Sequence, residues 1–487
     1  MSEYEAIIGM EVHAQLLTAS KMFCPCSASV FGAEPNTVVC PVCLGMPGVL
    51  PVLNRQVVEH GILIGLALNC DIAATAVFAR KNYFYADLPK SYQISQYDRP
   101  LARDGWLEID DPAGPPGVRK RIGIRRVHVE EDPARLFHGA DHTLADFNRS
   151  GLPLVEIVTE PDIRTPAEAR AYLVELRSIL RYLGASTGDM EKGAMRCEPN
   201  VSLRPAGRDA FGTRVEVKNL NSFRAVQHAL EYEIARQARR LDAGGRVRQV
   251  TMGWDEARGV TFEQRSKEES HDYRYFPEPD LPPLRISGAW VDAVRARLPE
   301  LPAARRARFA AEFGLSPADA AALTGDRAVA DYFEAAAAAG RTRDVPATTV
   351  ANWLLGDFFY LLNEAGTAIE EVDVAPGALA ELVALVEDGT VTATSGKAVL
   401  AEMFETGRLP AEIVEARGLG QISDVASLAR VVDEVVAANP DEVAKYRAGK
   451  GTLLAWFMGQ VMRATRGKAN PQVVTELLRD RLEGEDG

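Results

Sequence analysis

The chain has 487 residues, of which 47% are hydrophobic and 25% are charged, and this composition is typical of a globular protein. The length is too great for one ordinary core and favours about three domains. A formal net charge of -13 excludes a general electrostatic attraction to nucleic acid but not a local basic patch. The N-terminus lacks a signal-peptide pattern and no apolar run reaches the roughly eighteen residues that span a bilayer. We therefore expect a cytoplasmic protein without a membrane segment.

The first regular pattern is the alternation of apolar and polar residues from Ile7 to Leu16, which predicts a β-strand. In such a strand Glu11, His13 and Gln15 share one face. A sheet with several such strands would have one apolar face and one charged face, which suits a metal ion and a polyphosphate. Solubility alone explains any single polar face, so the argument depends on their joint occurrence. The polar residues of three later alternating segments are Glu156 and Glu160, then Glu198, Asn200, Ser202 and Arg204, then Arg214, Glu216 and Lys218.

Four of the six cysteines lie in one short segment, as the pairs Cys24 and Cys26, then Cys40 and Cys43. In a reducing cytosol this spacing predicts a four-thiolate zinc site and not two disulfides. Zinc would be structural, because four thiolates complete its tetrahedron, and it would stabilise a loop rich in Gly and Pro. The alternative is a set of unligated thiols or a redox pair.

Helical patterns are sparse at first and dominate later. Up to about residue 283 the chain has short alternating runs separated by turn signals, with one clear helical pattern from Pro166 to Leu183. Residues 298–388 are Ala-rich, which favours helices, and a third segment after residue 389 is again helical. The helices predicted in these two segments are Ala303–Phe313, a short helix with Ser316 as N-cap and Pro317 in its first turn, Val329–Ala339, Lys450–Thr465 and Asn470–Leu482.

The one basic island of this acidic chain lies between residues 445 and 470, which contain no acidic residue. One interpretation is a surface that contacts the phosphate backbone of a nucleic acid. The other is a solvated helix face whose cations also offset the dipole at a helix C-terminus, and the sequence alone favours neither. The basic residues of the island are Lys445, Arg447, Lys450, Arg463, Arg466 and Lys468.

Several long motifs are spread over essentially the whole chain. They are Ile8 to Leu16, Arg80 to Tyr85, Asp87 to Lys90, His128 to Asp132, Asn148 to Gly151, Arg196 to Arg204, Val217 to Ser222, Arg265 to Glu269, His271 to Pro277, Gly459 to Met462 and Gly467 to Gln472. Together they resemble the B subunit of the bacterial aspartyl/glutamyl-tRNA amidotransferases. That resemblance implies an antiparallel-sheet cradle domain, a helical domain and a small helical tail that binds tRNA, and hence an α+β fold. With the composition changes it gives domains of residues 1–295, including a zinc loop at 24–43, then 296–388 and 389–487.

The resemblance implies a ligase that uses ATP and Mg²⁺ to phosphorylate the side-chain carboxylate of Glu-tRNA(Gln) or Asp-tRNA(Asn). Ammonia from an amidase-like A subunit then displaces the phosphate, and a small C subunit completes a heterotrimer. The sequence does not decide between the two misacylated tRNAs. The tail residues assigned to tRNA are Lys450, Arg463, Arg466 and Lys468.

Matching motif by motif, we predict catalytic and Mg²⁺-binding roles for Glu11, His13, Glu131 and Glu198, with Glu130 as a neighbour or alternate. A continuous strand through His128 would instead turn Glu130 to the polar face and Glu131 to the apolar one, and a bulge would reverse that choice. Lys81, Lys90, Arg149 and Lys218 are predicted to bind phosphate oxygens, with backbone N–H groups at Ser150.

Two short segments depart from the family pattern. Glu198, Pro199 and Asn200 stand where the family usually has Asp-Ala-Asn, and Pro199 indicates a strand edge or bulge. Arg135 stands where a lysine is usual, which keeps the charge but not its geometry. Two other functions stay open, namely a noncatalytic tRNA-binding scaffold and a zinc-containing ATP-dependent ligase for a small carboxylic acid.

Overall fold

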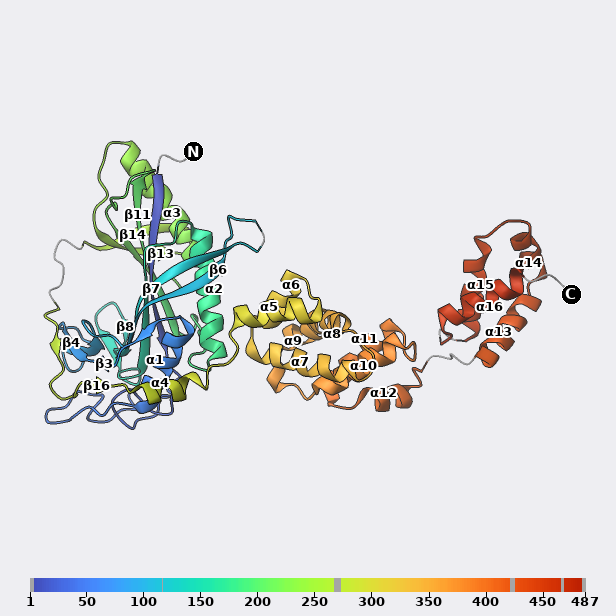
Figure 1. The fold of residues 1–487 in the computed structure, drawn as a ribbon, viewed down its shortest axis with the longest axis horizontal. Helices are drawn as coiled ribbons and strands as arrows, with labels where there is room; N and C mark the ends of the chain where they lie inside the picture. The colour runs from blue at the N-terminus through green and yellow to red at the C-terminus, as the bar shows by residue number, and fades with distance from the viewer. Residues whose placement is uncertain (1–3, 116, 267–272, 421–424, 466–467, 484–487) are drawn as a thin grey trace. The chain divides into compact units, whose positions relative to one another are not determined.

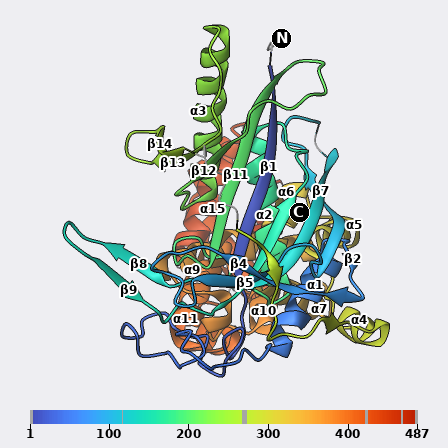
Figure 2. The ribbon, with the colours of Figure 1, turned by 90° about the vertical axis from the view of Figure 1, so that its left-hand side faces the viewer.

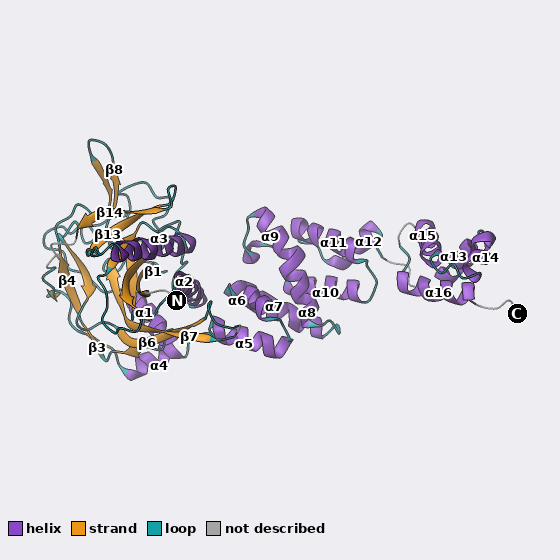
Figure 3. Cartoon of the chain, turned by 90° about the horizontal axis from the view of Figure 1, so that it is seen from above, coloured by secondary structure: helices purple, strands orange, loops and turns teal. Residues whose placement is uncertain are grey.

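The computed structural model describes residues 4–115, 117–266, 273–420, 425–465 and 468–483. The chain divides into two compact units, residues 1–302 and 303–487. Strands and helices both occur in the first unit, whereas the described residues of the second unit form helices and no strand (Figure 3). The predicted α+β class is therefore confirmed. None of the described helices is long and apolar enough to cross a membrane.

The first unit is built on a nine-stranded sheet in the order β14-β13-β12-β11-β1-β10-β7-β6-β2 (Figure 1). Its neighbouring strands are antiparallel, as predicted, except that β12 and β13 run parallel. The strands are β1 (Tyr4–Gln15), β2 (Asp71–Ile72), β6 (Ala102–Asp110), β7 (Arg119–Glu131), β10 (Pro153–Thr159), β11 (Met195–Pro205), β12 (Val215–Lys218), β13 (Val250–Asp255) and β14 (Val260–Ser266).

Three small sheets accompany the large one. The first has the order β15-β4-β5, the second pairs β16 with β3, and the third is a hairpin of β8 and β9 that projects from the rest of the unit (Figure 2). These strands are β3 (Thr75–Ala76), β4 (Phe78–Asn82), β5 (Tyr92–Gln96), β8 (Arg135–His138), β9 (Thr143–Asp146), β15 (Phe276–Pro277) and β16 (Leu284–Arg285).

The large sheet has one apolar face because its long strands alternate as the sequence predicts. In β1, Met10, Val12 and Ala14 are buried, and they join one hydrophobic core with residues of α1 (Arg55–Ala67), α2 (Pro166–Tyr182) and α3 (Phe223–Asp242). These three helices lie on the same side of the sheet (Figures 1 and 3). The odd-numbered side chains of β1 are thereby left on the other face.

The prediction of a single helix before residue 283 is wrong, because α1 and α3 were missed. In α1 almost every residue is buried, so no polar stripe marks a helical period. In α3 the buried face includes Glu233 and Gln237, which breaks the apolar pattern. The predicted helix α2 is confirmed, and Thr165 caps it by accepting a hydrogen bond from the backbone N–H of Glu168.

The described part of the second unit contains two separate hydrophobic cores. The first is shared by the helices from α5 to α12, so the predicted boundary at residues 388 and 389 lies between two helices of one core. The helices expected over Ala303–Phe313 and Val329–Ala339, and the Ser316 cap, are confirmed. The C-terminal pair is confirmed as α15 and α16.

The remaining helices of the chain follow in order. They are α4 (Gly288–Arg295) in the first unit, then α5 (Pro302–Phe313), α6 (Pro317–Thr324), α7 (Arg327–Arg341), α8 (Ala347–Trp353), a π-helix (Leu354–Phe358), α9 (Phe359–Ala365), a 3₁₀ turn (Ile369–Glu371), α10 (Pro376–Glu387), α11 (Ala393–Thr406) and α12 (Pro410–Arg417) around the first core, and α13 (Val425–Ala437), α14 (Pro440–Arg447), α15 (Leu453–Ala464) and α16 (Pro471–Glu483) around the second.

Candidate active site and metal centres

Four neighbouring strands bring ionisable side chains together on the polar face of the large sheet. The register keeps these residues on one face because each alternates with a core residue of its own strand. The residues aligned across β7, β10, β1 and β11 are His128, Glu156, His13 and Arg196. Beside this row, Glu11 of β1 faces Glu198 of β11.

His13 is the centre of this group. Its Nε2 lies 3.1 Å from Glu156 Oε2, 3.4 Å from Glu130 Oε1 and 3.9 Å from Glu11 Oε1. The Nε2 of His128 lies 3.5 Å from an oxygen of Glu130 and 3.5 Å from an oxygen of Glu156. Ligand atoms of these residues approach within 4.8 Å of one another in two overlapping triplets, a spacing that can hold a metal ion. We call the five residues the sheet site.

Opposite charges neutralise one another within the sheet site. Burial alone would raise the pKa of Glu156, but His128 and His13 outweigh it and lower that pKa to about 2. Burial would likewise lower the pKa of His13, but hydrogen bonds with Glu130 and Glu156 hold it well above its usual value. Glu11 differs, because burial and the nearby charge of Glu156 raise its pKa.

Glu130 and Glu131 are neighbours on β7 but point to opposite sides of the strand. Glu130 belongs to the sheet site, where Ser95 Oγ donates to it over 2.8 Å. Glu131 accepts hydrogen bonds from Lys90 Nζ and, over 2.9 Å, from the backbone N–H of Ile94. The register with β10 runs without a shift through both glutamates. The structure thus groups the predicted residues Glu11, His13 and Glu130 and separates Glu131 from them.

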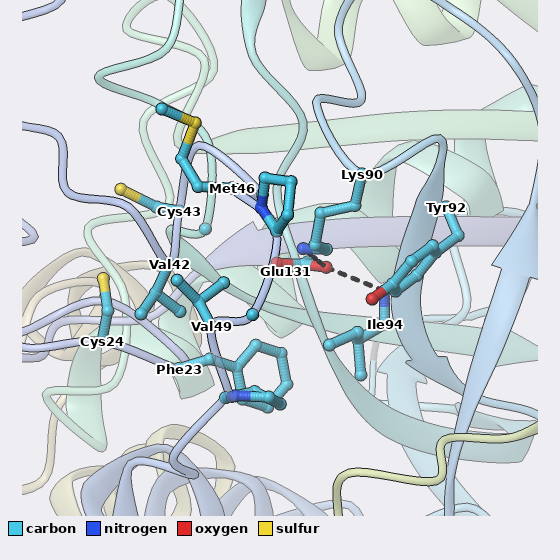
Figure 4. A pocket seen from close by; sticks show the side chains of 15 residues that line it. Phe23, Cys24, Val42, Cys43, Met46, Val49, Lys90, Tyr92, Ile94 and Glu131 are labelled. Atoms are coloured by element: carbon cyan, nitrogen blue, oxygen red, sulfur yellow. Dashed lines mark hydrogen bonds and ion pairs between the residues drawn. The ribbon is translucent and has the colours of Figure 1, made fainter.

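Glu131 and Lys90 form the floor of a cavity of about 230 Å³ beside the cysteine segment. Figure 4 shows Cys24 and Cys43 at one end of this cavity, and Lys90, Glu131 and Tyr92 at the other. The loop at Gly45 packs very closely on Lys90. Gly45 has a φ of +64°, and a Cβ placed there would lie 2.5 Å from Lys90 Cγ.

Two of the other predicted cations border the sheet site. Lys218 donates to Glu198 over 2.7 Å, which ties the predicted ligand Glu198 into an ion pair. The Nζ of Lys81 lies 5.0 Å from the centroid of the Tyr273 ring. Burial alone would lower the pKa of Lys81, but the charge of Glu130 contributes to a net increase, which is the effect of facing the carboxylates.

The two remaining predicted phosphate-binding residues lie in a loop beside the cysteine segment. Arg149 donates to the carbonyl groups of Pro133 and Ala134, over 3.0 and 2.9 Å. Ser150 Oγ donates to the carbonyl of Cys43 over 3.0 Å. Both side chains therefore donate hydrogen bonds to backbone carbonyl groups of this loop region.

Sequence reasoning assigned no role to Glu156 or His128, although both lie at the heart of the sheet site. The alternation of β10 had put Glu156 on a polar face, and the strand argument had put His128 beside Glu130, so the signal was present. It also missed Arg126, whose Nη2 lies 3.1 Å from Glu156 Oε1. These residues come together through the pairing register of β1, β10 and β7, which the sequence of a single strand does not reveal.

An open cavity of about 330 Å³ lies next to Glu11 on the sheet. It is lined by Gly9 and Glu11 of β1, by Asn200 and Ser202 of β11, and by Arg125. Phe211, with 63% of its surface exposed, and Arg214 complete its rim. The lining of the cavity therefore combines the carboxylate of Glu11 with polar groups, one exposed aromatic ring and two guanidinium groups.

The four predicted zinc ligands come together. Ligand atoms of Cys24, Cys26, Cys40 and Cys43 all lie within 4.8 Å of one another, and all four are free thiols. A hydrogen bond from Cys24 is the largest cause that lowers the pKa of Cys43 to about 4. Four sulfur donors at this spacing fit a tetrahedral Zn²⁺ site, with no position left for a substrate.

The predicted tRNA-binding residues belong to the second unit. Lys450, Arg463 and Lys468 have exposed side chains, with Arg463 in the last turn of α15. Arg466 lies outside the described residues. Exposure makes the three described cations available to a ligand but does not by itself distinguish the two interpretations of the basic island.

Comparison with known proteins gives a family for the whole chain. The profile of the GatB/GatE catalytic domain matches residues 6–292, and that of the GatB domain matches residues 331–482. The chain belongs to this family. It is 56% identical to a protein of Moorella thermoacetica over 99% of this chain and 100% of that one, and 51% identical to one of Myxococcus xanthus over 99% of each. Both relatives are named as the B subunit of an aspartyl/glutamyl-tRNA(Asn/Gln) amidotransferase, so the resemblance found in the sequence is confirmed.

Proposed function

We propose that this chain is the component of the amidotransferase that activates the side-chain carboxylate of Glu-tRNA(Gln) or Asp-tRNA(Asn) with ATP. The sheet site, beside an open cavity on the polar face of the sheet, carries the proposal. A carboxylate is a poor acceptor for ammonia and first needs a leaving group. Transfer of the γ-phosphoryl group joins a carboxylate oxygen to phosphorus and releases ADP. Ammonia then attacks the acyl carbon, and phosphate leaves as the amide forms.

The donor set of the sheet site fits Mg²⁺, which prefers oxygen ligands. Glu11 and Glu130 each have a carboxylate oxygen within metal-ligand spacing of Glu156. When bound, Mg²⁺ would neutralise charge on the phosphate oxygens of ATP. His13 and His128 are softer ligands, and we assign them to orient these carboxylates through their polar contacts. Glu130 thus replaces Glu131 in the predicted set, and Glu198 stays at its margin.

The cavity beside Glu11 suits the nucleotide. Phe211 offers an exposed ring on which a base can stack, and Arg214 offers a forked donor for phosphate oxygens. Lys81, whose pKa is raised in part by the charge of Glu130, would offset the charge of the transferred group. These side chains bind, orient and neutralise, which is what phosphoryl transfer asks of a protein.

The finer assignments complete the proposal. An amidase-like A subunit would supply ammonia, and a small C subunit would join them in a cytoplasmic heterotrimer. Zn²⁺ would occupy the four cysteines as a structural ion. Residues 1–295 would carry the chemistry, the helices α5 to α12 around one core would form a helical domain, and the helices α13 to α16 around the other would form the tail. In that tail Lys450, Arg463, Arg466 and Lys468 would contact tRNA phosphates.

The test is amide formation by the complex reconstituted with A and C subunits, with each misacylated tRNA in turn. We expect Glu156→Gln to lower ATP-dependent amide formation by about 10²–10³-fold, because one preorganised charge at the reacting centre is lost. The matched control is Glu263→Gln, which changes an exposed glutamate of β14 that pairs with Arg248. Normal amide yield with the Glu156 variant, or ATP turnover independent of tRNA, would reject the proposal.

A further inference from the structure

A fully buried lysine lies beneath the cysteine segment. Lys21 has 0% of its surface exposed. Its Nζ donates to the carbonyl of Val38 over 2.9 Å and to Cys43 Sγ over 3.7 Å. Of these two contacts, only the cysteine sulfur can carry a negative charge.

The backbone fixes Lys21 at this point. Its N–H donates to the carbonyl of Cys26, and the next residue, Met22, donates to the carbonyl of Gly151. The lysine stem passes Gly151 of the loop that precedes β10, where an added Cβ would make an ordinary contact of 3.7 Å with Lys21 Cδ. The whole side chain is buried, and its ammonium group is held by Val38 and Cys43.

A buried ammonium group is costly unless a counter-charge is close. Four thiolates around one divalent ion leave a net double negative charge, which is also costly to bury. The buried cation and the buried anionic centre can therefore neutralise each other. Cys24 and Cys43 are the two buried members of the cysteine group, and Lys21 contacts Cys43. Hydrogen bonds to a metal-bound sulfur also withdraw charge from it, which makes it a weaker nucleophile.

We propose that Lys21 is the built-in counter-cation of the zinc-thiolate centre, where it retains the metal and protects Cys43 from electrophiles. The proposal rests on the zinc assignment and is independent of the amidotransferase reaction. It makes Cys43 unequal to Cys24, although 4% and 7% of their surfaces are exposed. Both residues are buried, and of these two sulfurs the one in Cys43 has the Lys21 ammonium group against it.

The first experiment compares zinc release from the full-length chain with a chelator in excess and a coloured zinc reporter. We expect Lys21→Met, which keeps the length of the stem but removes the charge, to release zinc at least about 10-fold faster, and Lys21→Arg to be intermediate. The control is Lys192→Met, which removes an exposed lysine lying 5.6 Å from the Phe31 ring of the same loop. Release from Lys21→Met at the wild-type rate would overturn the proposal.

The second experiment needs no variant and so decides the matter even if Lys21→Met fails to fold. The zinc-bound wild type is treated with iodoacetamide, and modified cysteines are mapped by mass spectrometry over time. We expect Cys24 to react before Cys43, and Lys21→Met, if folded, to remove that order. Reaction of Cys43 as fast as Cys24 in the wild type would overturn the proposal. A wild type that holds no zinc after loading would overturn it together with the zinc site, while leaving the ATP assay as a separate test of function.

Discussion

The two candidate metal sites among the described residues of the first unit are built in opposite ways. The cysteine ligands come from residues 24 to 43 of one loop, so a short piece of chain can supply them all. The sheet site collects Glu11 from β1, Glu156 from β10 and Glu130 from β7, so it exists only when the sheet has formed. The local group can therefore stabilise the fold, whereas the assembled group depends on it.

The cysteine group and the sheet site also differ in the positive charges that lie against them. The cysteine group has one buried ammonium group against it, on Lys21. The carboxylates of the sheet site already lie against the guanidinium group of Arg126 and the imidazole rings of His13 and His128, with which an incoming cation must compete. A divalent ion at the sheet site is therefore expected to bind more weakly and to exchange with its nucleotide, whereas the sulfur site retains its ion.

The largest expected effect comes from removing the two metals separately. A zinc-selective chelator in the presence of excess Mg²⁺ should cost the first unit about 5 kcal/mol or more of stability, because structural zinc contributes folding free energy. Omitting Mg²⁺ while zinc is kept should stop ATP turnover and leave thermal unfolding unchanged. Calorimetry and phosphate release measure the two effects. If both treatments altered unfolding alike, the contrast between the sites would be lost.

The next effect separates the adjacent glutamates of β7. Glu130→Gln should lower ATP-dependent amide formation by about 10²–10³-fold, because its carboxylate lies in the sheet site. Glu131→Gln breaks the buried pair with Lys90 and should cost about 3 kcal/mol of stability while ATP binding survives. Thermal unfolding and nucleotide titration of both variants check this. Identical profiles for the two variants would show that they do not serve different sites.

The smallest effect concerns the second unit, whose exposed cations contrast with the buried ones of the first. Lys450→Ala and Lys468→Ala should each weaken tRNA binding severalfold and reduce the slope of log affinity against log salt by about 1. Filter binding at several salt concentrations measures it, and Lys397→Ala, a 59% exposed lysine paired with Asp357, is the control. An unchanged slope would assign the basic island to solvation.

The sequence predicted most of what is periodic or local. The alternation of β1, the cap of α6 and the cysteine group were all readable, because each depends on residues close together in the chain. The sheet site was only partly readable. Glu11 and His13 were named, but Glu156 and His128 join them through register across three strands, which no single strand encodes.

The choice between Glu130 and Glu131 shows the same limit at the scale of one residue. The shift in the β7 pairing lies before His128, between the partners of Val158 and Thr159. Alternation is therefore uninterrupted through Glu131, as the plain strand argument gave it. Motif matching had preferred Glu131, and only the position of the irregularity selects the residue that faces His13.

The glycine at position 45 sets a limit on mutational tolerance. Its left-handed backbone already disfavours any other residue, and an added methyl group would lie only 2.5 Å from Lys90 Cγ and 3.1 Å from the Lys90 backbone nitrogen. Gly45→Ala would force either the cysteine loop or the lysine stem to retreat. The absence of a side chain at Gly45 thus allows the cysteine loop to pack against the Lys90–Glu131 pair. In a library of variants, substitutions at position 45 should be tolerated less well than substitutions in the exposed loop around it.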